Sequence, residues 1–157
     1  MSRLTKDEYF MIMAKVAALR SVCKSRRVGA VLVDINGYVL STGYNGPPKG
    51  FQECDPCKRV GLKIGESLDD CPSIHAEQNA ILQCRDARSI DTLYVTSSPC
   101  VFCLKPLLNT PCKRIVFETL YPHPLSIEMW EKAGRIWTQF SGGTRASEIL
   151  EFINFIG

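Results

Sequence analysis

Two short strings of residues, separated by one strand-like segment, constrain the fold of this chain more than any other feature. The first is His75-Ala76-Glu77 and the second is Pro99-Cys100-Val101-Phe102-Cys103. One imidazole and two thiolates are ligands for a tetrahedral zinc ion, and three protein ligands leave its fourth position for water, as in catalytic zinc sites. A chain that uses them together must bring the starts of two neighbouring helices to the same point.

The spacing within each string agrees with helix starts. Cys100 and Cys103 are three residues apart and share one face of a first helical turn, and Pro99 is typical of a helix start. His75 and Glu77 are two residues apart, so they can converge only near a helix end. The helix dipoles at such ends favour thiolates and other anions.

The order of the two strings indicates a class of chemistry. The pattern H-x-E…P-C-x-x-C is typical of zinc nucleobase deaminases, in which the glutamate is the general acid and base. This gives Glu77 the catalytic role and makes His75, Cys100 and Cys103 the zinc ligands. A closed structural zinc is the alternative, and it requires a fourth protein ligand and leaves Glu77 without a role.

The composition fits one ordinary globular domain. The 157 residues are 45% hydrophobic and 22% charged, with a net charge of +3, which suits an anionic substrate but decides little by itself. No stretch approaches the ~18 apolar residues of a membrane span, and the N-terminus lacks the apolar core of a signal peptide. We therefore expect a cytoplasmic protein, whose eight cysteines are metal ligands or buried thiols instead of disulfides.

The order of the apolar patterns predicts an α/β fold with a leading hairpin. The capping box Thr5-Lys6-Asp7-Glu8 opens a helix from about Asp7 to Cys23, and Asn36-Gly37 is typical of a tight hairpin turn. Residues 43–70 have the composition of a long irregular segment, and Ser73 is a candidate cap for the helix after it. Strands are expected at 28–33, 38–44, 92–96, 114–117 and 135–138, and further helices at 74–84, 100–108, 126–133 and 144–155.

From about residue 5 to residue 138 the chain resembles the deoxycytidylate (dCMP) deaminase family. The zinc strings occur throughout the wider cytidine-deaminase superfamily, whereas the loop Gly43-Tyr44-Asn45-Gly46, together with residues 75–80 (HAEQNA), favours dCMP. The resemblance implies a three-layer α/β/α fold with a five-stranded mixed sheet, one domain over residues 1–157, and a homo-oligomer, either a hexamer or a dimer. Residues 141–157 are a helical extension that is atypical of the family.

The same resemblance implies a reaction and a set of substrate contacts. The reaction is zinc-dependent deamination of dCMP to dUMP and ammonia, which supplies dUMP for dTTP synthesis. The implied contacts are Asn45 with the deoxyribose, Arg26 or Arg27 with the 5′-phosphate, the backbone of Ala30 and Ser98 with the base, and Tyr121 near the substrate. The alternatives left open are a surface charge for either arginine, a turn residue for Asn45 and plain packing for Tyr121.

Two further sites are expected in the irregular segment. The loop with Gly43, Tyr44 and Gly46 resembles the segment that binds dCTP or dTTP effectors with Mg²⁺ in regulated family members. A second, structural zinc would order the segment, and the alternative is four unrelated thiols. Its expected ligands are Cys23, Cys54, Cys57 and Cys71, whereas Cys84 and Cys112 are expected in the core.

Rival functions remain at this point. One is deamination of another cytosine or adenine substrate, such as a modified dCMP, a nucleoside or a tRNA base. Another is a nucleic-acid-binding protein, which needs a basic groove with interleaved aromatic residues. The positive charges of this chain are dispersed, so we expect neither a stable nucleic-acid partner nor a membrane partner. His123 is expected to be an ordinary loop residue.

Overall fold

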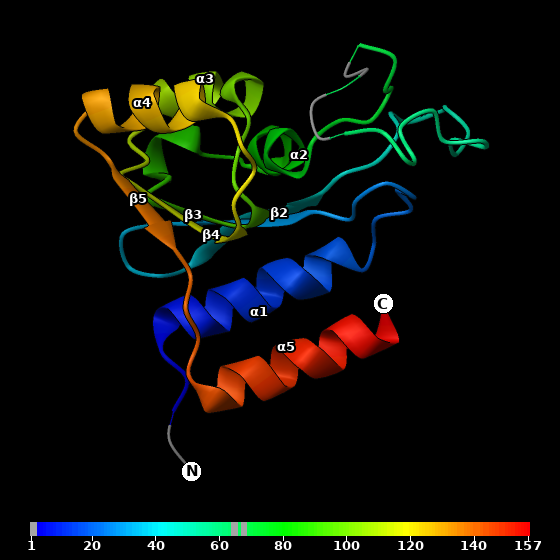
Figure 1. The fold of residues 1–157 in the computed structure, drawn as a ribbon. Coiled ribbons are helices and arrows are strands. Elements are labelled where there is room, and N and C mark those ends of the chain that lie inside the picture. Colours follow the sequence, from blue (N-terminus) through cyan, green and yellow to red (C-terminus); the bar gives the residue numbers. More distant parts are fainter. Residues whose placement is uncertain (1–2, 64–65, 67–68) are drawn as a thin grey trace.

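The computed structural model describes residues 3–63, 66 and 69–157, and it contains a five-stranded mixed sheet between two layers of helices (Figure 1). The strand order is β2-β1-β3-β4-β5, with β1 antiparallel to both β2 and β3, and with β3, β4 and β5 parallel. The predicted fold class is confirmed. The strands are β1 (Gly29–Val33), β2 (Val39–Tyr44), β3 (Thr92–Ser97), β4 (Arg114–Thr119) and β5 (Ile136–Gln139).

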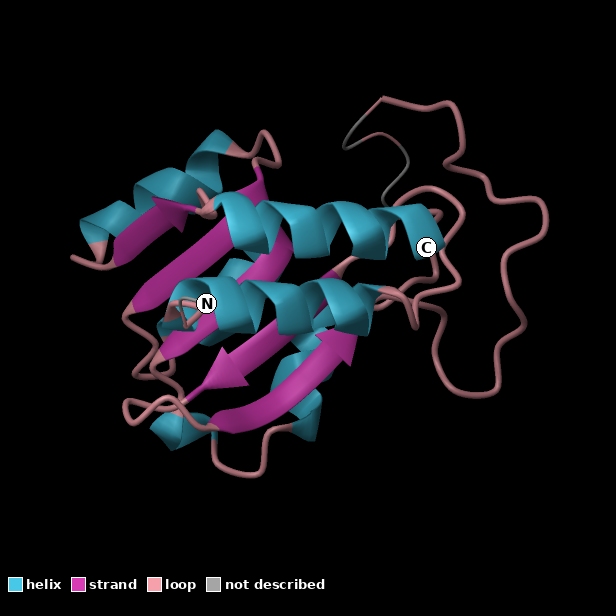
Figure 2. Ribbon diagram, turned by 90° about the horizontal axis from the view of Figure 1, so that it is seen from below, coloured by secondary structure: helices cyan, strands magenta, loops and turns pink. Residues whose placement is uncertain are grey.

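Helices cover both faces of the sheet (Figures 1 and 2). Because successive strand residues point to opposite faces, the sheet contributes to two separate cores: Leu32 and Val95 pack toward α2, α3 and α4, whereas Val31 and Tyr94 pack toward α1. The helices are α1 (Lys6–Ala18), α2 (Ala76–Gln83), α3 (Val101–Leu108), α4 (Pro124–Lys132) and α5 (Thr144–Ile156), with a short 3₁₀ turn at Ala87–Ser89.

Helix α1 begins as predicted and ends five residues early. The Thr5 hydroxyl accepts from the Glu8 N–H, and the Glu8 carboxylate accepts from the Thr5 N–H, so the capping box is present. The helix ends at Ala18, and the predicted continuation to Cys23 is wrong. The cause is Ser21, whose buried hydroxyl donates to Asn45 Oδ1 at 2.8 Å and accepts from the Cys23 N–H at 3.2 Å. These contacts draw Cys23 into a loop.

Two glycines allow helices to approach the sheet closely. A Cβ built on Gly29 of β1 would lie 1.9 Å from the Ala14 carbonyl oxygen of α1. A Cβ on Gly43 of β2 would lie 2.1 Å from the Ala76 carbonyl oxygen of α2. Only glycine fits at such distances from a helix backbone. Gly43 therefore sets the height of α2, and of the side chains at its start, above the sheet.

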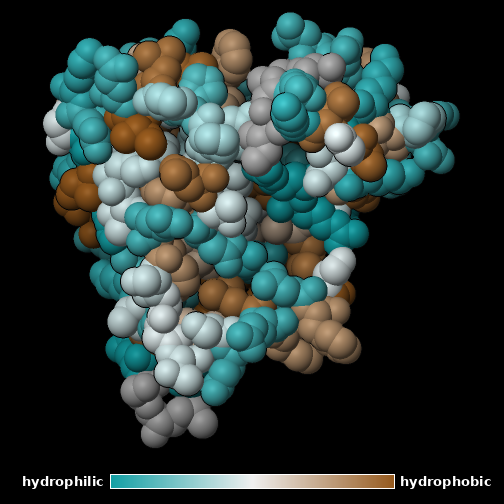
Figure 3. Space-filling model, viewed as in Figure 1, coloured by the Kyte–Doolittle hydropathy of each residue, from teal (hydrophilic) through white to brown (hydrophobic). Residues whose placement is uncertain are grey.

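The C-terminal helix α5 packs beside α1 on the outer side of the molecule (Figure 2). Ala146, Leu150 and Ile153 are buried in this contact, whereas Phe152 and Phe155 are exposed. Figure 3 shows apolar residues at the surface over the end of α5. No described helix is long and apolar enough to cross a membrane.

Candidate active site

Three potential metal ligands meet where α2 and α3 begin. His75 Nδ1 lies 3.2 Å from Cys103 Sγ and 3.5 Å from Cys100 Sγ, and the two sulfurs are 3.7 Å apart. Both thiols are buried, and the imidazole is partly buried. Within the described residues, this is the one group of three or more such side chains whose ligand atoms all lie within 4.8 Å.

The separations fit a zinc ion. With Zn–S of about 2.3 Å and Zn–N of about 2.0–2.1 Å, tetrahedral angles place ligand atoms roughly 3.5–3.8 Å apart. The sulfur–sulfur distance of 3.7 Å and the longer nitrogen–sulfur distance of 3.5 Å fall in that range. Because three corners of a tetrahedron are occupied by this chain, the site has the donor set of a catalytic zinc.

Helix caps bring the ligands together. His75 is the N-cap of α2 and Cys100 is the N-cap of α3, and both have extended backbone conformations. The Gln78 side chain accepts from the His75 N–H at 3.0 Å, which fixes the start of α2. The prediction that the two helix starts converge is confirmed. Ser73, the predicted cap of α2, lies two residues before the observed cap, and its hydroxyl donates to the Ile74 carbonyl oxygen at 3.4 Å.

Glu77 is a buried carboxylate beside this cluster. It is 4% exposed, and burial raises its pKa to about 7, against the opposing effect of the nearby His75 charge. Its carboxyl group also contacts the Cys103 thiol. A carboxyl that changes protonation near neutral pH is suited to accept and return a proton.

The two thiols differ in their acidity. Hydrogen bonds from the Cys103 thiol and from His75 lower the pKa of Cys100 to about 4, although burial opposes this. Cys103 donates to that thiolate and is itself buried, so its pKa is raised. The same contact with Cys100 raises the pKa of His75. Binding of a cation would favour the thiolate form of both side chains.

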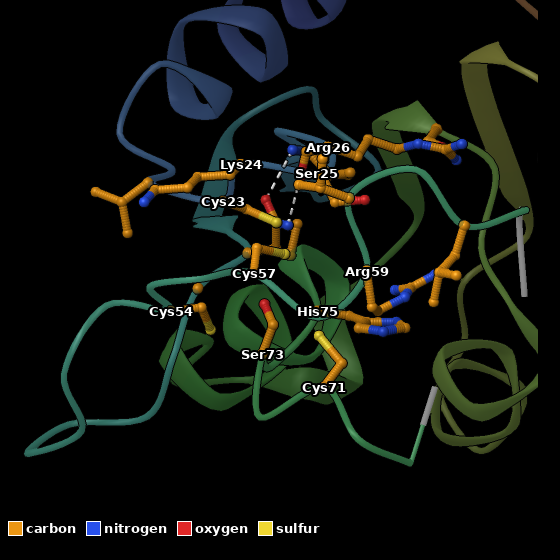
Figure 4. Close-up of a pocket in the computed structure, with 18 of the residues that line it drawn as sticks. Cys23, Lys24, Ser25, Arg26, Cys54, Cys57, Arg59, Cys71, Ser73 and His75 are labelled. Carbon is orange, nitrogen blue, oxygen red and sulfur yellow. Dashed lines mark hydrogen bonds between the residues drawn. The ribbon is translucent and has the colours of Figure 1, made fainter. Parts of the chain in front are cut away.

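A cavity of about 290 Å³ adjoins the cluster, because His75 and Cys100 are among the residues that line it. Figure 4 shows part of its lining. Its walls come from four parts of the chain: the loop after α1, the irregular segment between β2 and α2, the start of α2, and the end of β3 with the loop after β4. The part of the cavity that His75, Glu77 and Cys100 line is its floor. The cavity therefore joins a candidate metal centre to a space of ligand size.

The structure separates the two candidate phosphate-binding arginines. Arg26 lines the cavity, donates from Nη1 to Ser97 Oγ at 3.3 Å and lies 5.5 Å from the centre of the Tyr121 ring. Arg27 instead donates to the Gly157 carbonyl oxygen at the end of α5. The alternative of a surface charge therefore applies to Arg27, and Arg26 is the residue available to a ligand.

Ser98 and Tyr121 form one wall of the cavity together. The Ser98 hydroxyl accepts from the Tyr121 N–H at 2.7 Å, which ties the end of β3 to the loop after β4. Tyr121 stacks on His123, with ring centres 6.5 Å apart. His123 is the N-cap of α4, and it is absent from the described lining of the cavity.

Asn45 lines the cavity but is largely occupied by internal contacts. Its Oδ1 accepts from Ser21 Oγ and from the Val28 N–H, both at 2.8 Å, and its Nδ2 donates to the Arg26 carbonyl oxygen at 2.8 Å. One Nδ2 hydrogen remains for a ligand. The expectation that Ala30 borders the base is not matched by its position, because Ala30 is fully buried and outside the described lining of the cavity. Val28 lines the cavity instead.

The predicted effector loop holds α2 against the sheet. Gly43 packs on the backbone of α2, the Tyr44 carbonyl oxygen accepts from Asn79 Nδ2 at 2.8 Å, and Gly46 pairs with Ile74 through two backbone hydrogen bonds. Gly46 also lines the cavity. These contacts give the loop a structural role, and its binding of effectors stays a prediction.

The four cysteines expected at a second metal all line the same cavity (Figure 4). Burial and the neighbouring Cys57, Cys71 and Cys23 raise the pKa of Cys54, so the four thiols are within electrostatic range of one another. They do not form a group with all sulfurs within 4.8 Å among the described residues. The topology gathers the thiols, and their role as ligands stays a prediction.

Sequence reasoning missed Arg59. It stands two residues after Cys57, lines the cavity and lies next to His75 in the close-up (Figure 4). Its Nε is buried without a hydrogen-bond partner in the described part of the chain. The only sequence signal was its place directly after the C-x-x-C pair, since nothing in the spacing relates residue 59 to residue 75.

The sequence matches the family model for the zinc-binding region of cytidine and deoxycytidylate deaminases over residues 4–119. Deoxycytidylate deaminase of Schizosaccharomyces pombe is 41% identical over 121 residues, which cover 73% of this chain and 37% of that protein. Deoxycytidylate deaminase of Mycobacterium phage D29 is 39% identical over 125 residues, which cover 74% of this chain and 97% of the phage protein. The chain thus spans little over a third of one relative and nearly all of the other.

A solved structure shows the same arrangement of elements. The crystal structure of dCMP deaminase from the cyanophage S-TIM5, in complex with dCMP and dUMP, superposes with a TM-score of 0.73 and 28% sequence identity. The match covers 89% of this chain and 100% of the phage chain. The likeness extends beyond the zinc strings to most of the fold.

Proposed function

Because the chain belongs to the zinc-binding family of cytidine and deoxycytidylate deaminases, we propose that it converts dCMP and water to dUMP and ammonia. The observation that carries the proposal is the buried Glu77 beside the His75, Cys100 and Cys103 cluster, on the floor of a cavity that Arg26 also lines. This reaction would supply dUMP for dTTP synthesis.

In the proposed reaction, three residues at the cavity floor bind zinc and Glu77 transfers protons. His75, Cys100 and Cys103 would hold zinc, which supplies a water molecule whose pKa is lowered towards ~7. Glu77 takes a proton from the attacking water and places one on the pyrimidine nitrogen next to the amine-bearing carbon. It then takes the proton of the newly added hydroxyl group and delivers it to the amine, so the C–N bond breaks, a carbonyl forms and the amine leaves as ammonia. Its pKa of about 7 suits both directions of transfer.

The walls of the cavity provide contacts for the rest of dCMP. Arg26 would bind the 5′-phosphate, and Tyr121, on which its guanidinium lies, would pack beside the substrate. Backbone groups of Ser98 and Val28 would border the base. Asn45 would reach the deoxyribose through the Nδ2 hydrogen that the Arg26 carbonyl leaves free.

Ammonia release from a panel of substrates tests the proposal. The panel contains dCMP, CMP, deoxycytidine, 5-methyl-dCMP and AMP, together with a short RNA that carries adenosine in a loop. We expect dCMP to have the highest kcat/KM. Ammonia release from AMP or from the RNA, with none from dCMP, would contradict the proposal and support an adenine substrate instead.

A second, structural zinc is proposed at Cys23, Cys54, Cys57 and Cys71. The support is that four thiols from two parts of the chain, the loop after α1 and the irregular segment, line the cavity, and that a closed set of four thiolates is a structural zinc site. Zinc analysis of the purified protein should give two ions per chain. Cys57→Ser should leave one ion and destabilise the irregular segment, whereas Cys84→Ser should retain both.

Three further properties are proposed, the first two from the resemblance and the third as the expectation for a chain without a membrane-span pattern. The loop with Gly43, Tyr44 and Gly46 binds dCTP or dTTP with Mg²⁺, the chain forms a homo-oligomer, either a hexamer or a dimer, and the protein is cytoplasmic. Light scattering measures the oligomer size, and dCMP kinetics with and without dCTP or dTTP measure the effector response. A monomer whose dCMP kinetics do not respond to either triphosphate would contradict both.

A further inference from the structure

We propose that Arg59 binds the 5′-phosphate of the substrate together with Arg26, and that it thereby sets the preference for a nucleotide over a nucleoside. The proposal rests on the proposed deamination of dCMP and adds a specificity-determining residue to it. It assigns a role to a side chain that the mechanism leaves unused.

The first support is the unfilled hydrogen-bonding capacity of Arg59. Its Nε is buried and has no partner within residues 3–63, 66 and 69–157. A guanidinium has five N–H donors in a fixed fork and keeps its charge. Burying such a donor without a partner is costly, so a ligand that accepts from it would be stabilised in the cavity.

The second support is the position of Arg59 in the cavity. Arg59 lines the same cavity as His75, Glu77 and Arg26, and Figure 4 shows it next to His75, on the wall formed by the irregular segment. Arg26 reaches the cavity from a different segment, the loop after α1. A substrate held over Glu77 would therefore have a guanidinium on each of two walls.

The third support is that two carboxylates of the same segment have other partners and that Arg59 has no described ion pair. Asp55, in the same segment, accepts from Lys24 Nζ at 2.9 Å, and Glu66 Oε2 accepts from the Lys63 N–H at 3.0 Å. No ion pair of Arg59 is found in the described part of the chain. A structural salt bridge thus does not account for this arginine.

A monoester phosphate matches what the two arginines offer. It carries close to two negative charges at neutral pH and three acceptor oxygens. One guanidinium carries a single positive charge and pairs bidentately with two of those oxygens. Arg26 already donates to Ser97 and lies on the Tyr121 ring. A second guanidinium supplies the remaining donors, and an uncharged 5′-hydroxyl gains little from it.

Arg59→Gln tests the assignment by comparing a nucleotide with its nucleoside. We expect kcat/KM for dCMP to fall about 10- to 100-fold, the worth of one hydrogen bond to a charged group, while kcat/KM for deoxycytidine changes by less than about twofold. Calorimetry should show the same selective loss for dUMP relative to deoxyuridine. Arg59→Lys should recover part of the preference for the phosphate.

Lys58→Gln is the matched control, because it removes the same charge from the adjacent, exposed residue. It should leave kcat/KM unchanged for both dCMP and deoxycytidine. Equal losses for dCMP and deoxycytidine in Arg59→Gln would mean that Arg59 only supports the loop, and unchanged kinetics would mean that it does not meet the phosphate. Either result overturns the proposal. If the wild-type protein releases no ammonia from dCMP, the proposed function fails, and the binding ratio of dUMP to deoxyuridine still tests Arg59.

Discussion

At the scale of single residues, Glu77 illustrates how position and burial act together. His75 is the N-cap of α2, so the residue two positions later points toward the same helix end instead of the opposite side of the helix. Burial then raises the pKa of Glu77 to about 7. The sequence spacing predicted the position of Glu77 as a geometric requirement. Its burial involves residues distant in sequence, such as Cys103 of α3, and could not be predicted from the spacing.

Glu77→Gln should abolish turnover while leaving the metal centre intact. We expect the rate of ammonia release to fall by at least about 10³-fold, because both proton transfers pass through the carboxyl group. Zinc analysis should show the same metal content as the wild type, since the three ligands are untouched. Near-normal turnover with zinc retained would remove Glu77 from the chemistry.

At the scale of secondary-structure elements, Asp7 links α1 to the sheet through hydrogen bonds and an ion pair. Arg114 of β4 donates from Nη1 and Nη2 to the two carboxylate oxygens at 2.8 and 2.6 Å, and the Tyr94 hydroxyl of β3 donates at 2.8 Å. Burial would raise the pKa of Asp7, but these hydrogen bonds outweigh it, so the pKa lies below its ordinary value of 3.8. The capping box predicted the start of α1, and nothing in the sequence predicted the partners of Asp7.

Asp7→Asn should destabilise the protein in a pH-dependent way. A lowered carboxyl pKa means that the stabilisation is present above the unfolded-state value and is lost as the pH falls through the folded-state value. We expect a loss of about 1–2 kcal/mol at pH 7, from hydrogen bonds to a charged group at a partly exposed site. The difference from wild type in urea unfolding should shrink at pH values below 3.8.

The control for Asp7 is Glu128→Gln, which removes an exposed carboxylate paired with Lys132 four residues along α4. Its stability should stay close to that of the wild type at both pH values. A constant difference between Asp7→Asn and wild type from pH 7 to pH 3 would show that the charge of Asp7 does not contribute.

Gly43→Ala should displace α2 from the sheet. The added methyl group would lie 2.1 Å from the Ala76 carbonyl oxygen and 2.5 Å from the Ala80 nitrogen, both backbone atoms that cannot rotate away. We expect the free energy of unfolding, measured by thermal denaturation, to fall by about 3 kcal/mol. We also expect a lower kcat, because His75 and Glu77 move with α2. Gly46→Ala, where a Cβ meets nothing within 4 Å, should leave the melting temperature nearly unchanged.

The elements differ in how far the sequence predicted them. The strands and the helices α2 to α5 were predicted within about two residues, because apolar periodicity and turn residues act locally. The end of α1 was not, because Ser21 is held by Asn45 across 24 positions of sequence. The same limit hid Arg59, whose neighbour His75 is brought close only by the path of the irregular segment.

At the scale of the whole molecule, the packing of α5 bears on whether residues 141–157 unfold together with the rest of the chain. Its N-terminal end is tied to α1 by the Gly143 N–H, which donates to Glu8 Oε1 at 2.9 Å, and its other end contacts Arg27. Leu150 is 7% exposed between these ties. Because Arg27 adjoins Arg26, the packing of α5 also bears on a wall of the cavity.

Leu150→Ala should therefore lower the stability of the entire chain. We expect a loss of about 3 kcal/mol for truncating a buried leucine, seen at the same midpoint by far-ultraviolet circular dichroism and by fluorescence of Trp130 and Trp137, which lie in α4 and β5. Phe155→Ala, on the same helix but 87% exposed, should change the midpoint little. If Leu150→Ala lost helical signal at a lower denaturant concentration than tryptophan fluorescence, α5 would unfold by itself, and the single cooperative domain would have to be abandoned.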